Sequence, residues 1–345
     1  MDIIKEVLAA GGGCAIADSM FNFFEVTKVK LQIQPRVQPL MYNGMVNTLK
    51  RCVQEDGLWL GLMEPGLGAT VLRAFTYTGF RIGLYPTVRN MIDPPSKTKD
   101  ASPSSAAASL GTKMLAGATT GAISASVFCP IDVVRVRMQA QAGTVGPDGV
   151  TLVTGLRAGR PKEYASMADA FRKIVEHEGV RGLWRGVLPT VARAAGLSGS
   201  QLASYDSLKG SLKQGGWLPE GAALHLTCSL ASGLIAQTVI QPVDTVRSVV
   251  MAAHANFRET PLQGTAATAA VAATPSARSE LPRGLGGKGA EAVWEGLRPR
   301  GGGSSGGLRF LYRGFGAACC RQGPIMLIQM PLVEQLRLLL GLGCF

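Results

Sequence analysis

The chain has little of what metal sites and disulfide frameworks are built from. Its three histidines show no ligand spacing, and its seven cysteines are odd in number and form no C-x-x-C pair. We therefore expect no bound metal, no disulfide framework and a reducing environment. No nucleophile, base or cofactor constellation emerges either, so the sequence does not predict an enzyme or a bound organic cofactor.

Aromatic residues and unbroken apolar runs are also scarce. Hydrophobic residues make up 46% of the chain, aromatic residues make up 6%, and the mean hydropathy is +0.19. The segments 108–129 and 222–241 approach the roughly 20 residues that cross a bilayer, but small and hydroxylic residues interrupt them. Such residues let helices pack closely in lipid and face a wet interior. Composition therefore favours a membrane protein and leaves a soluble one open.

Acidic residues are outnumbered, which gives a net charge of +12 and a pI near 9.6. No nucleic-acid motif with interleaved aromatic residues is present, and the basic residues lie beside the apolar stretches. This distribution favours lipid headgroups and anionic solutes as partners over nucleic acid. The amino-terminal segment 1–13 has an early acid and no basic leader, so we expect any targeting signal to be internal.

One charged motif is present three times, each time at the end of an apolar stretch. An acid is followed three residues later by a base, and the three pairs are Glu25 and Lys28, Asp132 and Arg135, and Asp244 and Arg247. An acid and a base at this spacing share one helix face, and three such faces can pair around an axis. The sequence therefore predicts a charged gate with the pairs Glu25–Arg135, Asp132–Arg247 and Asp244–Lys28.

The recurrence predicts three units, at 1–100, 101–217 and 218–345. We expect long helices near 5–34, 67–92, 109–140, 188–213, 221–251 and 316–341, and short amphipathic helices near 44–55, 165–177 and 289–297. A polar linker is expected at 94–107. The segment 255–307, which is rich in Ala, Thr and Gly, is expected to be an inserted low-complexity loop.

Prolines are placed close to two of the motifs. Pro130 and Pro242 lie inside helical patterns, where a proline removes a hydrogen bond and bends the helix. The first copy has Phe23 at the corresponding position. We therefore expect its helix to be straighter, or to be bent by another device.

The three copies resemble the signature of the mitochondrial carrier family, visible as Lys28-Val29-Lys30-Leu31-Gln32 and Arg135-Val136-Arg137-Met138-Gln139. The resemblance covers nearly the whole chain outside the inserts. It implies an all-α membrane protein in the mitochondrial inner membrane, with six transmembrane helices, three short matrix helices, pseudo-threefold symmetry, alternating access and a monomeric state. The ion pairs would then close the matrix side, braced by Gln32 and Gln139, while Met251 replaces the third glutamine.

The same resemblance implies a second charged gate on the cytoplasmic side. Its motif reads Asp206 to Lys209 and Glu334 to Arg337, whereas the first copy has Pro86 in place of the acid, followed by Arg89. The family's pairing would join Asp206 to Arg337 and Glu334 to Arg89. Lys209 would have no partner.

An arginine lies thirteen residues before each acid position of this second motif, at Arg73, Arg193 and Arg321. Three arginines at one depth of a wet cavity would repel each other unless an anion lay among them, and guanidinium groups suit carboxylates. The alternative is that they reach lipid phosphates or cap helix carbonyls. The family's substrate contacts fall on these helices, so the resemblance implies that the three arginines are substrate ligands.

Helix amino termini marked by an aromatic residue, a base and a glycine imply bound cardiolipin in the same family. The matching residues are Gly44, Arg185, Gly186, Arg313 and Gly314.

The segments 73–89, 183–209 and 321–337 resemble uncoupling proteins and the dicarboxylate and oxoglutarate carriers. Our first hypothesis is an exchanger of dicarboxylates or oxo-dicarboxylates such as malate, oxoglutarate or oxaloacetate. The alternatives are a proton leak controlled by purine nucleotides and a membrane adaptor that has lost transport.

Overall fold

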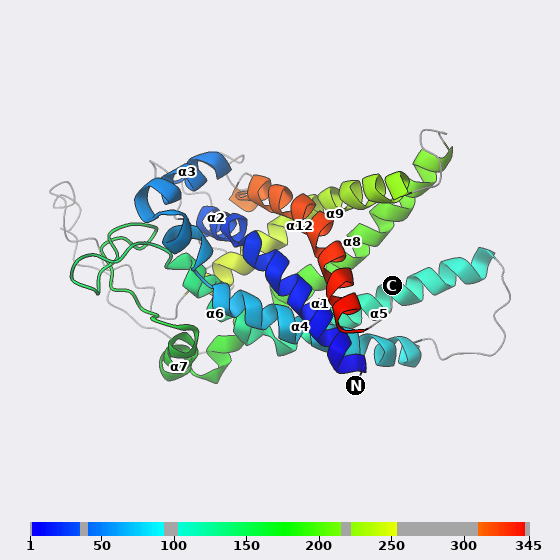
Figure 1. Ribbon diagram of the computed structural model, residues 1–345, viewed down its shortest axis with the longest axis horizontal. Coiled ribbons are helices and arrows are strands. Elements are labelled where there is room, and N and C mark those ends of the chain that lie inside the picture. Colours follow the sequence, from blue (N-terminus) through cyan, green and yellow to red (C-terminus); the bar gives the residue numbers. More distant parts are fainter. Residues whose placement is uncertain (1, 35–40, 93–102, 215–221, 254–309, 342–345) are drawn as a thin grey trace, which may run out of the picture.

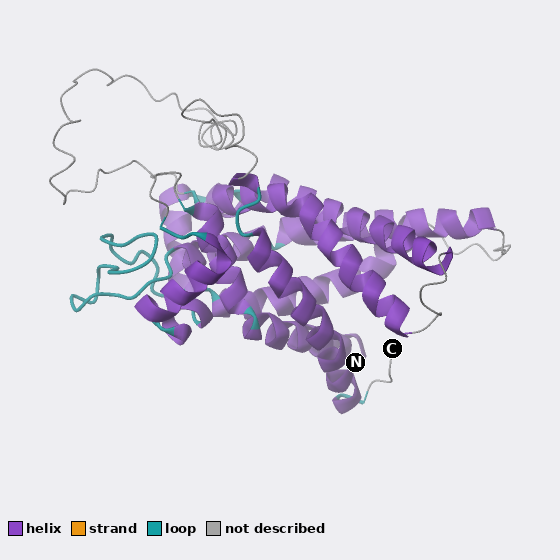
Figure 2. Cartoon of the chain, turned by 90° about the horizontal axis from the view of Figure 1, so that it is seen from above, coloured by secondary structure: helices purple, strands orange, loops and turns teal. Residues whose placement is uncertain are grey.

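The computed structural model describes residues 2–34, 41–92, 103–214, 222–253 and 310–341. Within these ranges every regular element is a helix, and the only β pairing is two isolated bridges in the loop before α7 (Figure 2). The predicted helix at 289–297, the predicted insert at 255–307 and most of the predicted linker lie outside the described residues.

Six helical segments correspond to the six long helices predicted from the sequence. They are α1 Asp2–Met20 with α2 Asn22–Ile33, α4 Leu67–Ile92, α5 Pro103–Val127 with α6 Cys129–Ala140, α8 Val187–Gln214, α9 Ala222–Ala252 and α12 Phe315–Leu339. One boundary differs, because α5 begins at Pro103, inside the predicted linker. Proline is favoured in the first turn of a helix, where its missing N–H has no intrahelical acceptor.

The long helices form a closed ring. Each packs against its neighbours in the order α1, α4, α5, α8, α9 and α12, and α12 returns to α1 (Figure 1). The second segments of the broken helices, α2 and α6, contact each other and α9 at one end. This end carries the repeated charged motif.

Two short helices lie at this end, as the sequence predicts: α3 Gly44–Asp56 and α7 Met167–Glu178. Each leads into a single helical turn, η1 Trp59–Met63 or η2 Val180–Trp184. The first turn is π-helical, with Glu64 N–H donating to Trp59 O over 2.9 Å, whereas the second is a tighter 3₁₀ turn. The first copy has two more residues than the second between the glycine after its short helix and the glycine before the next long helix, Gly57 to Gly66 against Gly179 to Gly186. The wider π turn accommodates them.

Two of the long helices are broken just before the charged motif. The axis turns by 62° between α1 and α2 and by 65° between α5 and α6. The residue at each break is a phenylalanine four positions before the motif acid, Phe21 (φ −104°, ψ 17°) and Phe128 (φ −96°, ψ 9°). Pro130 lies within the first turn of α6, and the helix α9 continues through Pro242. The bend expected at Pro130 is therefore confirmed, because a proline removes the hydrogen bond to the residue four positions earlier and the break lies within that stretch. At Pro242 the helix α9 is not interrupted.

The first helix is bent without a proline, and Asn22 holds the bend. Its side-chain amide lies 2.8 Å from Met63 O and 3.2 Å from Pro65 O, and it donates to both carbonyls. Asn22 is fully buried. These hydrogen bonds fix the start of α2 against the turn that leads into α4.

Among the described residues, no single helix has both the length and the apolar composition of a membrane span. Two bent pairs have them: Ile4–Met20 with Asn22–Ile33, and Leu115–Val127 with Cys129–Ala140.

The loop 141–163 of the second copy contacts the first copy at the end that carries the motif. Two antiparallel bridges, Val145 with Leu152 and Thr151 with Pro161, shape it, and Leu152 is buried. Asp56 at the end of α3 accepts hydrogen bonds from Thr144 N–H (3.1 Å) and from the Thr154 hydroxyl. The loop of the second copy is thereby attached to the short helix of the first.

Candidate functional site

The three ion pairs predicted between the motif copies are present. Lys28 Nζ lies 2.7 Å from Asp244 Oδ2, and Arg247 Nη2 lies 2.6 Å from Asp132 Oδ2. Arg135 Nη2 lies farther from Glu25 Oε1, at 4.0 Å. Each pair joins two different copies, so α2, α6 and α9 are held together in a closed ring of charges.

The three arginines predicted to bind the substrate lie directly on this ring of charges. Arg73 Nε is 2.6 Å from Asp132 Oδ1, and Arg193 Nε is 2.5 Å from Asp244 Oδ1. Arg321 Nη1 is 2.9 Å from Glu25 Oε2. The arginines therefore face the interior of the helical ring, which excludes the alternative that they reach outward to lipid phosphates. Each motif acid holds two cations, an arrangement that the sequence did not predict.

Asp18 is a fourth carboxylate of the site, and sequence reasoning missed it. Its Oδ1 accepts a hydrogen bond of 2.7 Å from Arg321 Nη2. Asp18 lies seven residues before Glu25, which is two helical turns on the same face. This spacing was the available signal, although the break at Phe21 separates the two residues.

The site carries more positive than negative charge. Six cations face four carboxylates, so the described side chains leave two positive charges in excess. The residues are Lys28, Arg73, Arg135, Arg193, Arg247, Arg321, Asp18, Glu25, Asp132 and Asp244. Uncompensated charge is costly away from bulk water, so the arrangement favours binding of an anion. Arg73 also lies over the ring of Tyr77, with Cζ 5.2 Å from the ring centroid.

The two predicted braces do not contact the ion pairs. Gln32 Nε2 donates to Thr245 Oγ1 (3.2 Å), and Gln139 Nε2 donates to Asn22 Oδ1 (3.4 Å). Both glutamines are buried, and their Oε1 atoms accept no hydrogen bond. The two glutamines therefore do not brace the ion pairs, because their amide groups donate to these polar side chains of the neighbouring helices instead. At the third position, the Met251 carbonyl accepts from Arg137 Nε (3.2 Å).

At the opposite end the predicted pair between Glu334 and Arg89 is not formed, and both described side chains are exposed. They lie on α12 and α4, which α1 separates in the ring. Arg337 Nη1 instead donates to Glu6 Oε1 on α1 (3.0 Å). The side chain of Asp206 lies outside what the structure describes, and Lys209 makes no ion pair with a described side chain. Among the side chains that the structure describes, a ring of ion pairs closes the end with the repeated motif and none closes the opposite end.

The residues predicted to bind lipid lie at helix starts. Gly44, Gly186 and Gly314 have φ of 77°, 92° and 78°, at the beginning of α3, α8 and α12. Arg185 Nη1 donates to Ala253 O (3.0 Å), and Arg313 Nη1 donates to Gln34 O (3.4 Å). The glycines therefore shape the turns, while both arginines also bind protein carbonyls.

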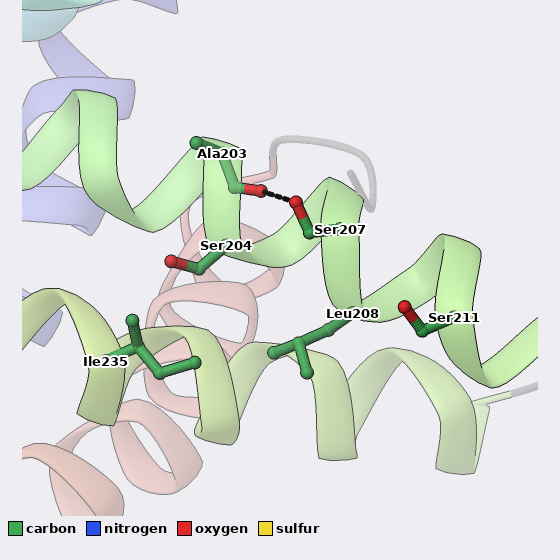
Figure 3. Close-up of a pocket in the computed structure, with 6 residues that line it drawn as sticks. All are labelled: Ala203, Ser204, Ser207, Leu208, Ser211 and Ile235. Atoms are coloured by element: carbon green, nitrogen blue, oxygen red, sulfur yellow. Dashed lines mark hydrogen bonds between the residues drawn. The ribbon is translucent and has the colours of Figure 1, made fainter.

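A shallow cavity of about 340 Å³ lies away from the charged site, between α8 and α9 (Figure 3). Its lining is Ala203, Ser204, Ser207, Leu208, Ser211 and Ile235. The Ser207 hydroxyl donates to Ala203 O over 2.8 Å. This cavity has no charged lining residue and is separate from the arginines.

Comparison with known proteins agrees with the ring of helices and its charged end. The family model described as mitochondrial carrier protein matches residues 1–95 and 106–216. A Dictyostelium discoideum protein, mitochondrial substrate carrier family protein ucpB, is 32% identical over 71% of this chain and 74% of its own length. The dog putative mitochondrial transporter UCP3 is 34% identical over 71% of this chain and 73% of its own length. The Arabidopsis thaliana mitochondrial uncoupling protein 5 is 33% identical over 70% and 77%.

The family match extends over more than half of the chain, and the named relatives are mitochondrial transporters and uncoupling proteins. Six long helical segments and the repeated charged motif fit the three-repeat, six-helix carrier fold. The chain therefore belongs to the mitochondrial carrier family and is a multi-pass transport protein of the mitochondrial inner membrane.

Proposed function

We propose that this carrier is of the uncoupling-protein type and conducts a proton leak that a purine nucleotide inhibits. The observation that carries the proposal is the excess of two positive charges around Arg73, Arg193 and Arg321 at the closed end. Its named relatives include uncoupling proteins. The sequence offers no acid between Arg193 and Tyr205 that would act as a pH sensor for the nucleotide, so inhibition rests on the arginines themselves.

The three arginines lie on three different helices, α4, α8 and α12. A nucleotide phosphate chain that received hydrogen bonds from all three would hold these helices in one arrangement. Transport by alternating access requires the closed end to open, so such a ligand would inhibit it. For the proton we assign Asp18, because it is the carboxylate of the site that lies outside the repeated motif and its side chain is 22% exposed.

A second candidate is exchange of dicarboxylates or oxo-dicarboxylates, as the sequence first suggested. One observation favours it specifically: a dianion would neutralise the two excess charges of the site. The closed ring at one end and the missing Glu334–Arg89 pair at the other correspond to one of the two states that an exchanger adopts. A complete ring of three pairs speaks against a chain that has lost transport.

Flux measurements on the full chain in liposomes separate the two candidates. A pH-sensitive dye would report proton entry with and without GTP, and labelled malate and oxoglutarate would report exchange. GTP-sensitive proton flux supports the first candidate, and exchange without proton flux supports the second. Folded protein that shows neither activity would overturn both.

Arg193→Ala is expected to abolish the response to GTP under the first candidate and the exchange under the second. Arg172→Ala is the matched control, because Arg172 is an exposed arginine on α7 whose partner is Glu176. Equal loss in both variants would show a general defect rather than a role for Arg193.

We also propose that the protein is a monomer that binds cardiolipin at the starts of α3, α8 and α12. The first N–H groups of a helix have no intrahelical acceptor and favour phosphate. Cardiolipin should therefore raise the melting temperature in detergent more than phosphatidylcholine does. An equal effect of the two lipids would contradict this proposal.

A further inference from the structure

The pseudo-threefold ring of charges is unequal at Arg135. The motif cations of the other two copies, Lys28 and Arg247, lie 2.7 and 2.6 Å from their acids. Arg135 Nη2 lies 4.0 Å from Glu25 Oε1, beyond hydrogen-bonding distance. The second copy therefore contributes a cation that is only loosely paired.

Two of the donor groups of Arg135 are also unused. The residue is 5% exposed, yet its Nε and Nη2 make no hydrogen bond. Arg247 is different, because its Nε donates to Thr190 Oγ1 over 3.0 Å. Thr70 occupies the position in α4 that corresponds to Thr190, and each hydroxyl donates to the carbonyl four residues earlier, but Thr70 accepts no hydrogen bond from Arg135.

Glu25 differs from the other two motif acids in that its second cation, Arg321, also binds a fourth carboxylate. Arg321 Nη1 lies 2.9 Å from Glu25 Oε2 and holds this carboxylate from the other side. Arg321 is itself shared with Asp18, and its Nε makes no hydrogen bond. Arg135 and Arg321 thus present three buried guanidinium nitrogens that make no hydrogen bond beside the same carboxylate.

A buried donor that makes no hydrogen bond destabilises the site, and it does so more strongly when the group is charged. Nε and Nη2 lie on one edge of the guanidinium plane, which is the edge that receives an oxyanion through two parallel hydrogen bonds. The chemistry of Arg135 therefore matches a carboxylate or phosphate group better than it matches the distant Glu25.

We propose that Arg135, together with Arg321, forms a subsite for one oxyanion group of the anion that binds the three arginines. The proposal rests on the proposed function, because it presupposes that an anion binds Arg73, Arg193 and Arg321. It adds that the ligand lies off the pseudo-threefold axis, toward α6 and α12, and contacts a residue of the gate itself. Arg135 then selects anions with a second charged group that reaches α6.

Thermal unfolding of the full-length protein in detergent tests the subsite, with GTP, inorganic phosphate and malate as separate probes. Arg135→Lys keeps the charge and removes the two-donor edge, so we expect about tenfold weaker stabilisation by the probe that binds, equivalent to about 1.4 kcal/mol. Its melting temperature without a probe should stay close to that of the wild type, because the pair with Glu25 is loose. Arg135→Gln provides a second variant if the lysine variant folds poorly.

Arg247→Lys is the matched comparison, because Arg247 has two close partners; it should lower the melting temperature without a probe. Arg172→Lys on the exposed face of α7 should match the wild type throughout. A response to GTP or phosphate that Arg135→Lys weakens indicates a phosphate subsite, and a weakened response to malate indicates a carboxylate subsite. Either result supports the proposal. Wild-type affinity in both Arg135 variants would overturn the subsite alone, whereas a wild type that no probe stabilises would overturn the proposed function with it.

Discussion

Lys28 and Asp244 lie 216 positions apart in the chain and meet through an ion pair of 2.7 Å between Nζ and Oδ2. Both are buried, and the pair joins the first and the last copy of the motif. It thereby completes the ring of charges that the other two pairs begin. Asp244 also holds Arg193, so a single carboxylate serves both the gate and the anion site.

Asp244→Asn should destabilise the protein by about 3–5 kcal/mol, because it leaves Lys28 and Arg193 as buried cations without a charged partner. Lys28→Met should cost less, since Asp244 keeps Arg193. Thermal unfolding in detergent would measure both. Asp169→Asn is the control: Asp169 is only partly buried on α7, and a hydrogen bond from Lys173 lowers the pKa of its carboxyl. If the three variants unfold alike, the ring does not contribute to stability.

Glu178→Gln should destabilise the protein by about 3 kcal/mol, since it removes the carboxylate that binds the buried Arg137 through two hydrogen bonds of 2.7 and 2.8 Å. Glu176→Gln is the matched control, because Glu176 lies two residues before Glu178 on α7 and binds the exposed Arg172. Chemical or thermal unfolding in detergent distinguishes them. A loss in Glu176→Gln as large as that in Glu178→Gln would contradict the prediction.

Thr154→Val should cost about 1–3 kcal/mol, because the valine removes a hydroxyl that donates to the buried Asp56. Limited proteolysis should also cut the loop 141–163 faster in this variant, as its attachment to α3 weakens. Thr151→Val provides the control within the same loop, where the hydroxyl binds the carboxylate of Asp148 at the surface. Unchanged proteolysis in Thr154→Val would show that the loop is held by other contacts.

Gly186→Ala should be more harmful than Gly44→Ala. Both glycines have positive φ, which disfavours alanine by about 1–2 kcal/mol. At Gly186 a Cβ would also lie 2.9 Å from Met251 Cγ, whereas at Gly44 no atom lies within 4 Å. Combining Gly186→Ala with Met251→Ala should recover the part of the loss that is due to crowding. Melting temperatures of the wild type, the two glycine variants and the double variant test this prediction. If the double variant shows no recovery, backbone strain is the whole cause of the loss.

The sequence predicted the ion pairs because each depends on a spacing that recurs and on a cyclic order of copies. It did not predict that Arg73, Arg193 and Arg321 contact the same acids, since that contact depends on the reach of side chains between helices that are far apart in the chain. Asp18 was missed because it belongs to no repeated motif. The roles expected of Gln32 and Gln139 failed for a local reason, the presence of Thr245 and Asn22 within reach of their amides.

The helix boundaries followed from periodicity and from the turn residues, as α4 and α3 show. The break before α6 lies beside Pro130, which is a strong local signal. The break before α2 was harder to predict, because Asn22 acts through carbonyls about 40 residues away. The motif alone could not show whether Glu334 and Arg89 form an ion pair in this conformation. Which end of such a ring is closed is a property of the conformation, and one sequence encodes both states.

The three copies differ in how they can respond when the charged ring opens. The first and second copies meet it through separate segments, α2 and α6, that turn sharply from the helices before them. The third meets it through α9, one uninterrupted helix of 31 residues. The short segments can swing while the preceding helices stay in place, but α9 can only tilt as a whole. Release of Asp244 from Lys28 would therefore move the far end of α9 as well, so that this helix acts as a lever linking the two mouths of the carrier.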